Sequence, residues 1–123
     1  MIRKHADSIG HALDGLVWAL RTQHNYRAHF LLILISVIAG FILEIKYHEW
    51  LIILSLSMLG LIIETINTAI EKVGDAIDTN YNENIKIAKD VSAAAMLIYS
   101  IGAAVGASMI FIPKIFVLLT SIA

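Results

Sequence analysis

Three long apolar stretches separated by short polar segments constrain this chain more than any other feature. We expect them to be membrane spans over about residues 28–45, 50–72 and 91–112, because a helix needs about 20 apolar residues to cross a bilayer. Of the 123 residues, 59% are hydrophobic and 15% are charged, and a soluble domain of this size cannot bury so much apolar surface. The sequence therefore predicts an all-α membrane protein, with a single domain over residues 1–123.

An amphipathic pattern precedes the first span, over about residues 1–27. Ile9, Leu13, Leu16 and Leu20 recur at steps of three and four residues, and charged residues and histidines lie between them. A helix with one apolar and one polar face suits the membrane surface. The predicted fold is thus an N-terminal surface helix followed by three transmembrane helices.

Basic residues are distributed unevenly between the two sides of the predicted spans. Seven of the nine lysines and arginines lie before the first span or between the second and third, and only Lys46 and Lys114 lie on the opposite side. Because cytoplasmic segments of membrane proteins are enriched in basic residues, we expect the N-terminus to face the cytoplasm. The formal net charge is −1, which argues against nucleic acid as a partner.

A polar stripe interrupts the end of the second span. Glu64, Asn67, Glu71, Asp75 and Asp78 recur at steps of three and four residues, which places them on one face of a helix. Carboxylates at the end of a membrane-length apolar segment are costly and indicate a functional site. The alternative is a helix that has left the membrane and presents an acidic face to water. The functional site is favoured because Glu64 and Asn67 lie inside the apolar run.

These polar residues gather at one interface, where a membrane-dissolved molecule can meet a water-soluble one. Glu71, with Asp75 or Gln23 nearby, can hold a hard cation such as Mg²⁺, which prefers oxygen ligands and substrate phosphates. Lys89 can meet a phosphate as a point charge. Glu64 lies deeper in the apolar run, where a carboxylate can act as a general base towards an alcohol. Together these roles indicate phosphoryl transfer to a lipid hydroxyl.

Several other kinds of site are disfavoured. The chain has no cysteine, and its five histidines do not show zinc-ligand spacing. The sequence contains neither a Walker-type phosphate loop nor the glycine loop of protein kinases, so a nucleotide site must be built differently. Ser92 and Ser100 lack a recognisable base, and we interpret them as small packing residues of the third span, together with Gly102 and Gly106.

Two motifs resemble those of the small prokaryotic diacylglycerol kinase family, which includes the undecaprenol kinases. Residues 64–75 read ETINTAIEKVGD, where the family has E-x-x-N-[ST]-A-[IL]-E-x-x-x-D. Residues 88–95 read AKDVSAAA, where the family has A-K-D followed by small residues. The resemblance covers nearly the whole chain. It implies a diacylglycerol-kinase-like helical bundle in the bacterial inner membrane, with its active site on the cytoplasmic side.

The resemblance also implies a homotrimer with composite active sites at subunit contacts, which uses MgATP to phosphorylate a membrane lipid alcohol. By position, Glu64 would accept the proton, Asn67 would support the site and Glu71 would be a magnesium ligand. The same positional match implies a set of residues around the nucleotide and its metal: Lys4, His11, Gln23, Glu71, Asn80, Tyr81, Asn82, Lys89 and Asp90.

Gln23 departs from the family pattern, which usually has a second metal-binding glutamate just before the first span. An amide oxygen can ligate Mg²⁺ but brings no charge, so we expect a lower metal affinity unless Asp75 compensates.

The lipid substrate and two rival functions stay open. Residues 21–29, RTQHNYRAH, resemble the undecaprenol kinase branch more than the diacylglycerol branch, which favours a polyprenol. One rival is a catalytically weak or inactive membrane adaptor of the same fold, for which Gln23 is the main argument. The other is a small oligomeric channel lined by the polar stripe, which would leave Lys89 and Asp90 without a role.

Overall fold

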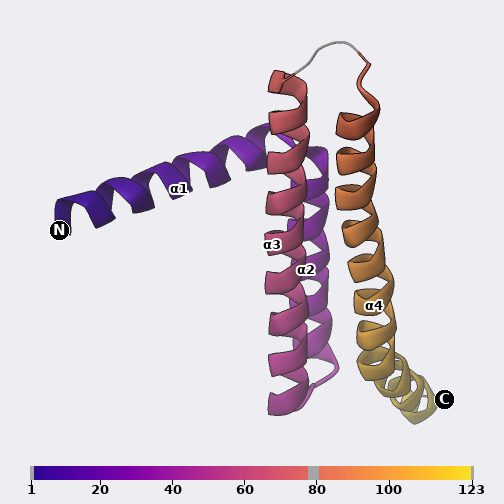
Figure 1. Ribbon diagram of the computed structural model, residues 1–123. Helices are drawn as coiled ribbons and strands as arrows, with labels where there is room; N and C mark the ends of the chain where they lie inside the picture. The colour runs from indigo at the N-terminus through magenta and orange to yellow at the C-terminus, as the bar shows by residue number, and fades with distance from the viewer. Residues whose placement is uncertain (1, 78–80, 123) are drawn as a thin grey trace.

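The computed structural model describes residues 2–77 and 81–122, apart from the side chains of residues 2–4, 6 and 122. Four helices make up this part of the chain: α1 (Ile2–Thr22), α2 (His24–Ile42), α3 (Tyr47–Ile77) and α4 (Glu83–Ile122). The three long apolar helices run side by side, and α1 leaves them at a wide angle (Figure 1). The predicted all-α membrane fold is confirmed.

Three helices are long and apolar enough to cross a membrane, over His24–Ile42, Tyr47–Ile77 and Glu83–Ser121. Their outer surface consists of large apolar side chains: Phe41, Ile98 and Met109 expose 72%, 73% and 75% of their surface. Such a surface is unfavourable in water. It suits lipid, where each helix satisfies its own backbone hydrogen bonds.

Most helix boundaries differ from those of the expected spans by several residues, and two of the differences change the architecture. A single residue with extended backbone, Gln23, separates α1 from α2, although the sequence pattern predicts a surface helix over about residues 1–27. The other difference is in α4, which continues through Pro113 to Ile122, well beyond the expected end at residue 112. Proline removes only one backbone donor, and transmembrane helices tolerate it.

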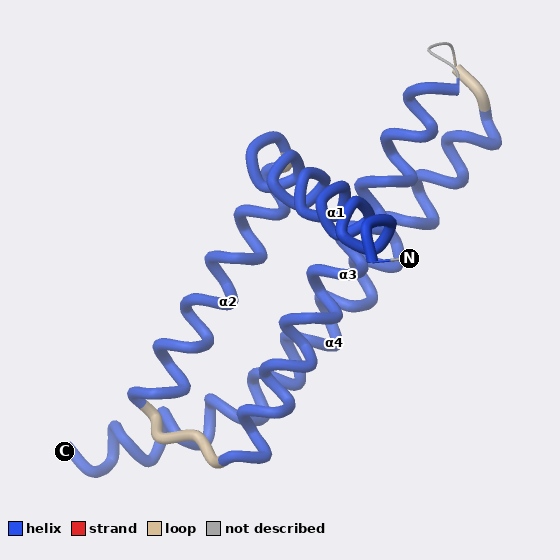
Figure 2. The backbone as a smooth tube through the Cα atoms, turned by 90° about the vertical axis from the view of Figure 1, so that its left-hand side faces the viewer, coloured by secondary structure: helices blue, strands red, loops and turns tan. Residues whose placement is uncertain are grey.

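The central helix is α3, which packs most extensively against α4 and also against α2. In the view of Figure 2, α4 runs along α3 for most of its length, in keeping with the more extensive packing of these two helices. At the α2–α3 turn, Ile45, Ile53 and Ile110 form a small apolar core. Near the same end, Glu49 and Lys114 form an ion pair with 3.1 Å between the charged atoms, which ties the start of α3 to α4.

Gly60 permits a close approach between α3 and α4. A Cβ atom at this position would lie 2.6 Å from the Tyr99 hydroxyl of α4 and would clash with it. Because glycine has no Cβ, the Tyr99 hydroxyl can reach α3 and donate a hydrogen bond to the Leu56 carbonyl. The polar stripe lies on the part of α3 that follows this contact. Packing at Gly60 therefore fixes how α4 faces the stripe.

Candidate functional site

Glu64 is almost completely buried in the second half of α3. Its side chain is 2% exposed, and its Oε2 atom has no hydrogen-bond partner within the described chain. The Asn25 side chain, at the start of α2, lies close enough to hydrogen-bond the Glu64 carboxyl, and Glu71 is close enough to interact with it electrostatically. A buried polar atom without a partner is costly unless a ligand completes its hydrogen bonding. Glu64 is therefore the clearest sign of a ligand site in this structure.

Asn67 connects α3 to α4 through buried hydrogen bonds. Its Nδ2 donates to Glu71 Oε1 over 3.1 Å, and its Oδ1 accepts from the Ser92 hydroxyl over 2.7 Å. Asn67 and Ser92 are 5% and 8% exposed. The structure thus brings Glu64, Asn67 and Glu71 together on one face of α3, as the stripe predicts.

Ser92 does more than the packing role that the sequence suggests for it. Its hydroxyl belongs to the hydrogen-bonded network of Asn67 and Glu71. The sequence could have indicated this role through the spacing from Lys89, a predicted site residue, because residues three apart lie on the same helix face. That face of α4 is the one turned towards the stripe.

Asp75 and Lys89 form an ion pair between α3 and α4. Lys89 Nζ lies 2.5 Å from Asp75 Oδ1, and Lys72 Nζ lies 3.5 Å from Oδ2. Gly74 leaves room for the lysine, because a Cβ atom there would lie 2.9 Å from Lys89 Cε. Both oxygens of Asp75 therefore face ammonium groups, and Asp75 can take its expected role as a metal ligand only if these pairs open.

Lys72 also links the surface helix to this network. Its Nζ lies 5.9 Å from the centroid of the Trp18 ring, in the geometry of a cation–π contact. The charged contacts therefore run from α1 through α3 to α4.

The residues expected at the nucleotide near the start of α4 have other contacts here. Asp90 pairs with Lys86 over 2.6 Å, not with Lys89. Asn82 Oδ1 accepts the backbone N–H of Asn84 over 3.0 Å, which caps α4. Tyr81 is 80% exposed. Asn80 and Asp78 lie outside the described residues.

Among the described residues, neither His11 nor Gln23 has a hydrogen bond or ion pair with the stripe. His11 is exposed on α1. Gln23 is half-buried at the break between α1 and α2, and its Nε2 donates to the Thr22 hydroxyl over 3.1 Å. The Lys4 side chain lies outside the described residues.

Tyr26 is a buried residue of α2 that the sequence motifs do not single out. It is 1% exposed, and its hydroxyl is hydrogen-bonded to that of Thr65, the neighbour of Glu64. Thr65 donates its own proton to the Leu61 carbonyl over 2.6 Å, so Tyr26 is the donor to Thr65. This bond fixes the start of α2 against α3 beside Glu64.

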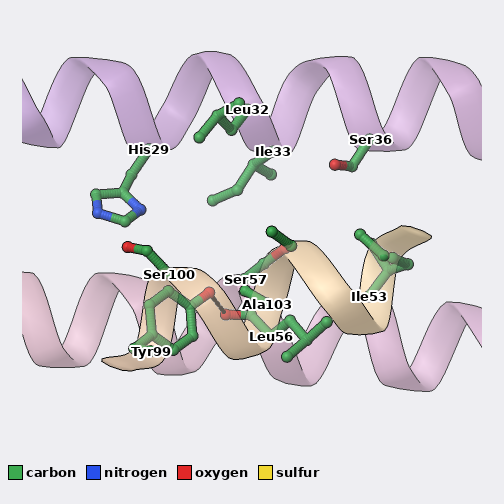
Figure 3. A pocket seen from close by; sticks show the side chains of 12 residues that line it. His29, Leu32, Ile33, Ser36, Ile53, Leu56, Ser57, Tyr99, Ser100 and Ala103 are labelled. Atoms are coloured by element: carbon green, nitrogen blue, oxygen red, sulfur yellow. Dashed lines mark hydrogen bonds between the residues drawn. The ribbon is translucent and has the colours of Figure 1, made fainter. Parts of the chain in front are cut away.

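A cavity of about 240 Å³ lies between α2, α3 and α4. Its lining is mainly apolar, with Ser36 from α2, Ser57 from α3 and Ser100 from α4 among the polar exceptions. Figure 3 shows His29 of α2 pointing across this space towards Ser100. His29 follows Tyr26 by three residues, so the cavity begins one turn of α2 beyond the Tyr26–Thr65 contact.

The acidic residues fit a magnesium ion that is shared with a substrate. Among the described residues, no group of three or more acidic or histidine side chains is arranged to hold a metal. Mg²⁺, however, commonly binds through one or two carboxylates and completes its shell with waters and substrate phosphates. Glu71, whose Oε1 accepts the Asn67 amide N–H over 3.1 Å, supplies one such carboxylate at this face of α3.

Comparison with known proteins places this chain in a family. The family model described as prokaryotic diacylglycerol kinase matches residues 10–111, which include the stripe and Ser92. The chain belongs to the prokaryotic diacylglycerol kinase family. Its members are lipid kinases, so the chain belongs to an enzyme family.

Relatives in the diacylglycerol kinase family carry two names. The undecaprenol kinase of Bacillus subtilis is 32% identical over 108 residues, which cover 88% of both chains. The diacylglycerol kinase of Escherichia coli K12 is 33% identical over 89 residues, which cover 72% of this chain and 73% of that one. The diacylglycerol kinase of Synechocystis is 31% identical over 109 residues, 88% of this chain and 62% of that protein.

Proposed function

We propose that this chain transfers the γ-phosphoryl group of ATP to the hydroxyl of a membrane lipid, giving the lipid phosphate and ADP. The observation that carries the proposal is Glu64, a buried carboxylate with an unpartnered oxygen beside Glu71. The reaction takes place at the cytoplasmic face of the bacterial inner membrane, where ATP is available and where the basic residues are expected to lie.

Glu64 is the general base in this reaction. Its free Oε2 accepts the proton of the lipid hydroxyl while the hydroxyl oxygen attacks the γ-phosphorus. The bond between the γ-phosphorus and the bridging oxygen breaks, and ADP leaves with the electron pair. Asn67 holds the neighbouring Glu71 carboxylate through its amide N–H.

Glu71 is the main ligand for Mg²⁺, with Gln23 and Asp75 as further candidates. When bound, the ion neutralises charge on the phosphates of ATP. Lys89 and Asp90 contact the bound ATP. To bind a phosphate oxygen of ATP, the Lys89 ammonium must break its ion pair with Asp75, in which the charged atoms are 2.5 Å apart.

The assembly is a homotrimer whose subunits share their sites. His11 and Tyr81 are both exposed in a single chain, which suits nucleotide contacts completed by a neighbouring subunit. Chemical cross-linking in bilayers, followed by mass measurement, tests the subunit number.

Undecaprenol is the favoured lipid. The undecaprenol-kinase-like segment at residues 21–29 supports it, and so does the Bacillus subtilis relative, which this chain matches over 88% of its length. The cavity between α2, α3 and α4 can receive part of a long apolar chain. Phosphorylation of undecaprenol and diacylglycerol in matched mixed micelles compares kcat/KM for the two lipids. A higher value for undecaprenol supports this choice, and a higher value for diacylglycerol contradicts it.

Replacing Gln23 with glutamate should lower the Mg²⁺ concentration needed for half-maximal activity several-fold. The substitution adds a carboxylate where the family usually has one, and carboxylate oxygens are ligands that Mg²⁺ prefers. A Mg²⁺ titration of lipid phosphorylation measures the effect, with Gln23→Ala as the control. An unchanged or higher requirement in Gln23→Glu would show that the missing carboxylate does not limit metal binding.

A further inference from the structure

Ser92 reaches the proposed metal-binding carboxylate through Asn67. We infer that Ser92 is a positioning residue that orients Glu71 for its cation by fixing the Asn67 amide. The inference rests on the proposed role of Glu71 as a magnesium ligand. It assigns a function to a residue that looks, in sequence, like one of many small residues in an apolar span.

The two ends of the Asn67 amide face chemically different partners. Its Nδ2 faces Glu71 Oε1 at 3.1 Å, and its Oδ1 faces the Ser92 hydroxyl at 2.7 Å. If the amide were rotated by 180°, a carbonyl oxygen would face a carboxylate oxygen, which is repulsive. Only the observed orientation lets Asn67 donate to Glu71. The Ser92 hydroxyl on α4 secures that orientation by donating to Asn67 Oδ1.

Ser92 does not need Asn67 for its own hydrogen bonding, whereas Asn67 needs Ser92. The single Ser92 proton has two acceptors, Asn67 Oδ1 at 2.7 Å and the Lys89 carbonyl of its own helix at 2.9 Å, and it is donated over the shorter distance; the helix carbonyl remains as an acceptor if Asn67 moves away. Asn67 Oδ1 is buried, and Ser92 is its hydrogen-bond partner in the described chain. Removing the hydroxyl therefore leaves Asn67 Oδ1 unsatisfied and lets the amide turn.

Rotation of Asn67 changes Glu71 directly. Glu71 would lose the N–H donor that holds Oε1, and its carboxylate would no longer be fixed against α3. Hydrogen-bond partners that orient a metal ligand typically account for about 10–100-fold in metal affinity. Asn67 is such a partner of Glu71, and Ser92 in turn orients Asn67.

Mn²⁺ binding measured by electron paramagnetic resonance tests this role, with Mn²⁺ as the spectroscopic substitute for Mg²⁺ and a non-hydrolysable ATP analogue present. The full chain in lipid nanodiscs is compared as wild type, Ser92→Ala and Ser92→Thr. Ser121→Ala is the matched control, because the Ser121 hydroxyl donates over 2.8 Å to the Leu118 carbonyl of the same helix and lies at the opposite end of α4 from the motif. Thermal unfolding of each variant is recorded in parallel.

We expect Ser92→Ala to raise the Mn²⁺ dissociation constant about tenfold. Ser92→Thr should restore binding because it keeps the hydroxyl, and Ser121→Ala should bind as the wild type does. Wild-type affinity in Ser92→Ala would overturn the inference. So would an equal loss in Ser92→Thr when its unfolding temperature is unchanged, or a wild-type chain that does not bind Mn²⁺.

Lipid phosphorylation by the wild-type chain separates this inference from the proposed function. If the wild type shows the expected Mn²⁺ binding pattern but phosphorylates neither lipid, the proposed function fails and the role of Ser92 in the cation site stands. If the wild type phosphorylates lipid and Ser92→Ala binds Mn²⁺ normally, the positioning role fails alone.

Discussion

Replacing Glu64 with glutamine should abolish lipid phosphorylation while leaving MgATP binding largely intact. Glutamine has nearly the same shape, so packing around this buried site is kept, but the amide cannot accept the proton of the lipid hydroxyl. Loss of a general base costs about 100- to 10,000-fold in rate. Transfer of labelled phosphate measures the rate, and a fluorescent ATP analogue measures binding.

The matched control for this change is Glu44→Gln. Glu44 is an exposed glutamate in the turn between α2 and α3, at the opposite end of α3 from the stripe. It should keep wild-type activity. If Glu64→Gln retained most of the activity, the assignment of the base would be wrong.

Replacing Glu71 with glutamine should give a different pattern, with metal binding lost together with turnover. Glu71 is half-buried, and Asn67 holds one of its two oxygens. Removing its charge takes away the main ligand of the proposed cation site, and we expect Mn²⁺ affinity to fall by more than the roughly 100-fold upper range for partners that only orient a ligand. Electron paramagnetic resonance and Mg²⁺ titration of activity measure it.

The comparison between the two variants is the sharper test, because both remove one carboxylate from the same face of α3. Glu64→Gln should keep the cation and lose the chemistry, whereas Glu71→Gln should lose the cation. If both variants lost Mn²⁺ binding to the same extent, the two carboxylates would share one role and the division proposed for them would fail.

Much of the architecture follows from the sequence because lipid leaves few alternatives. An apolar run of membrane length forms a helix to satisfy its own backbone, which is why three such runs predict three long helices. The stripe is predictable for a related reason, since steps of three and four residues return to one helix face. Glu64, Asn67 and Glu71 accordingly share a face of α3, as expected.

Contacts between helices could not be predicted in the same way. Periodicity gives the faces of one helix but not how a second helix is rotated against it. The bonds from Ser92 to Asn67 and from Tyr26 to Thr65 depend on that rotation, which close packing such as that at Gly60 sets. The pairing of Lys89 with Asp75 likewise depends on the space that Gly74 leaves.

The most direct test of the account is whether the purified wild-type chain moves labelled γ-phosphate from ATP into a lipid. Mixed micelles containing undecaprenol or diacylglycerol, with and without Mg²⁺, are extracted with organic solvent and the label in the lipid phase is counted. We predict label in lipid phosphate only when Mg²⁺ is present, and none with Glu64→Gln. An absence of label with both lipids, for the wild type and for Gln23→Glu, would contradict the account and favour a non-catalytic adaptor.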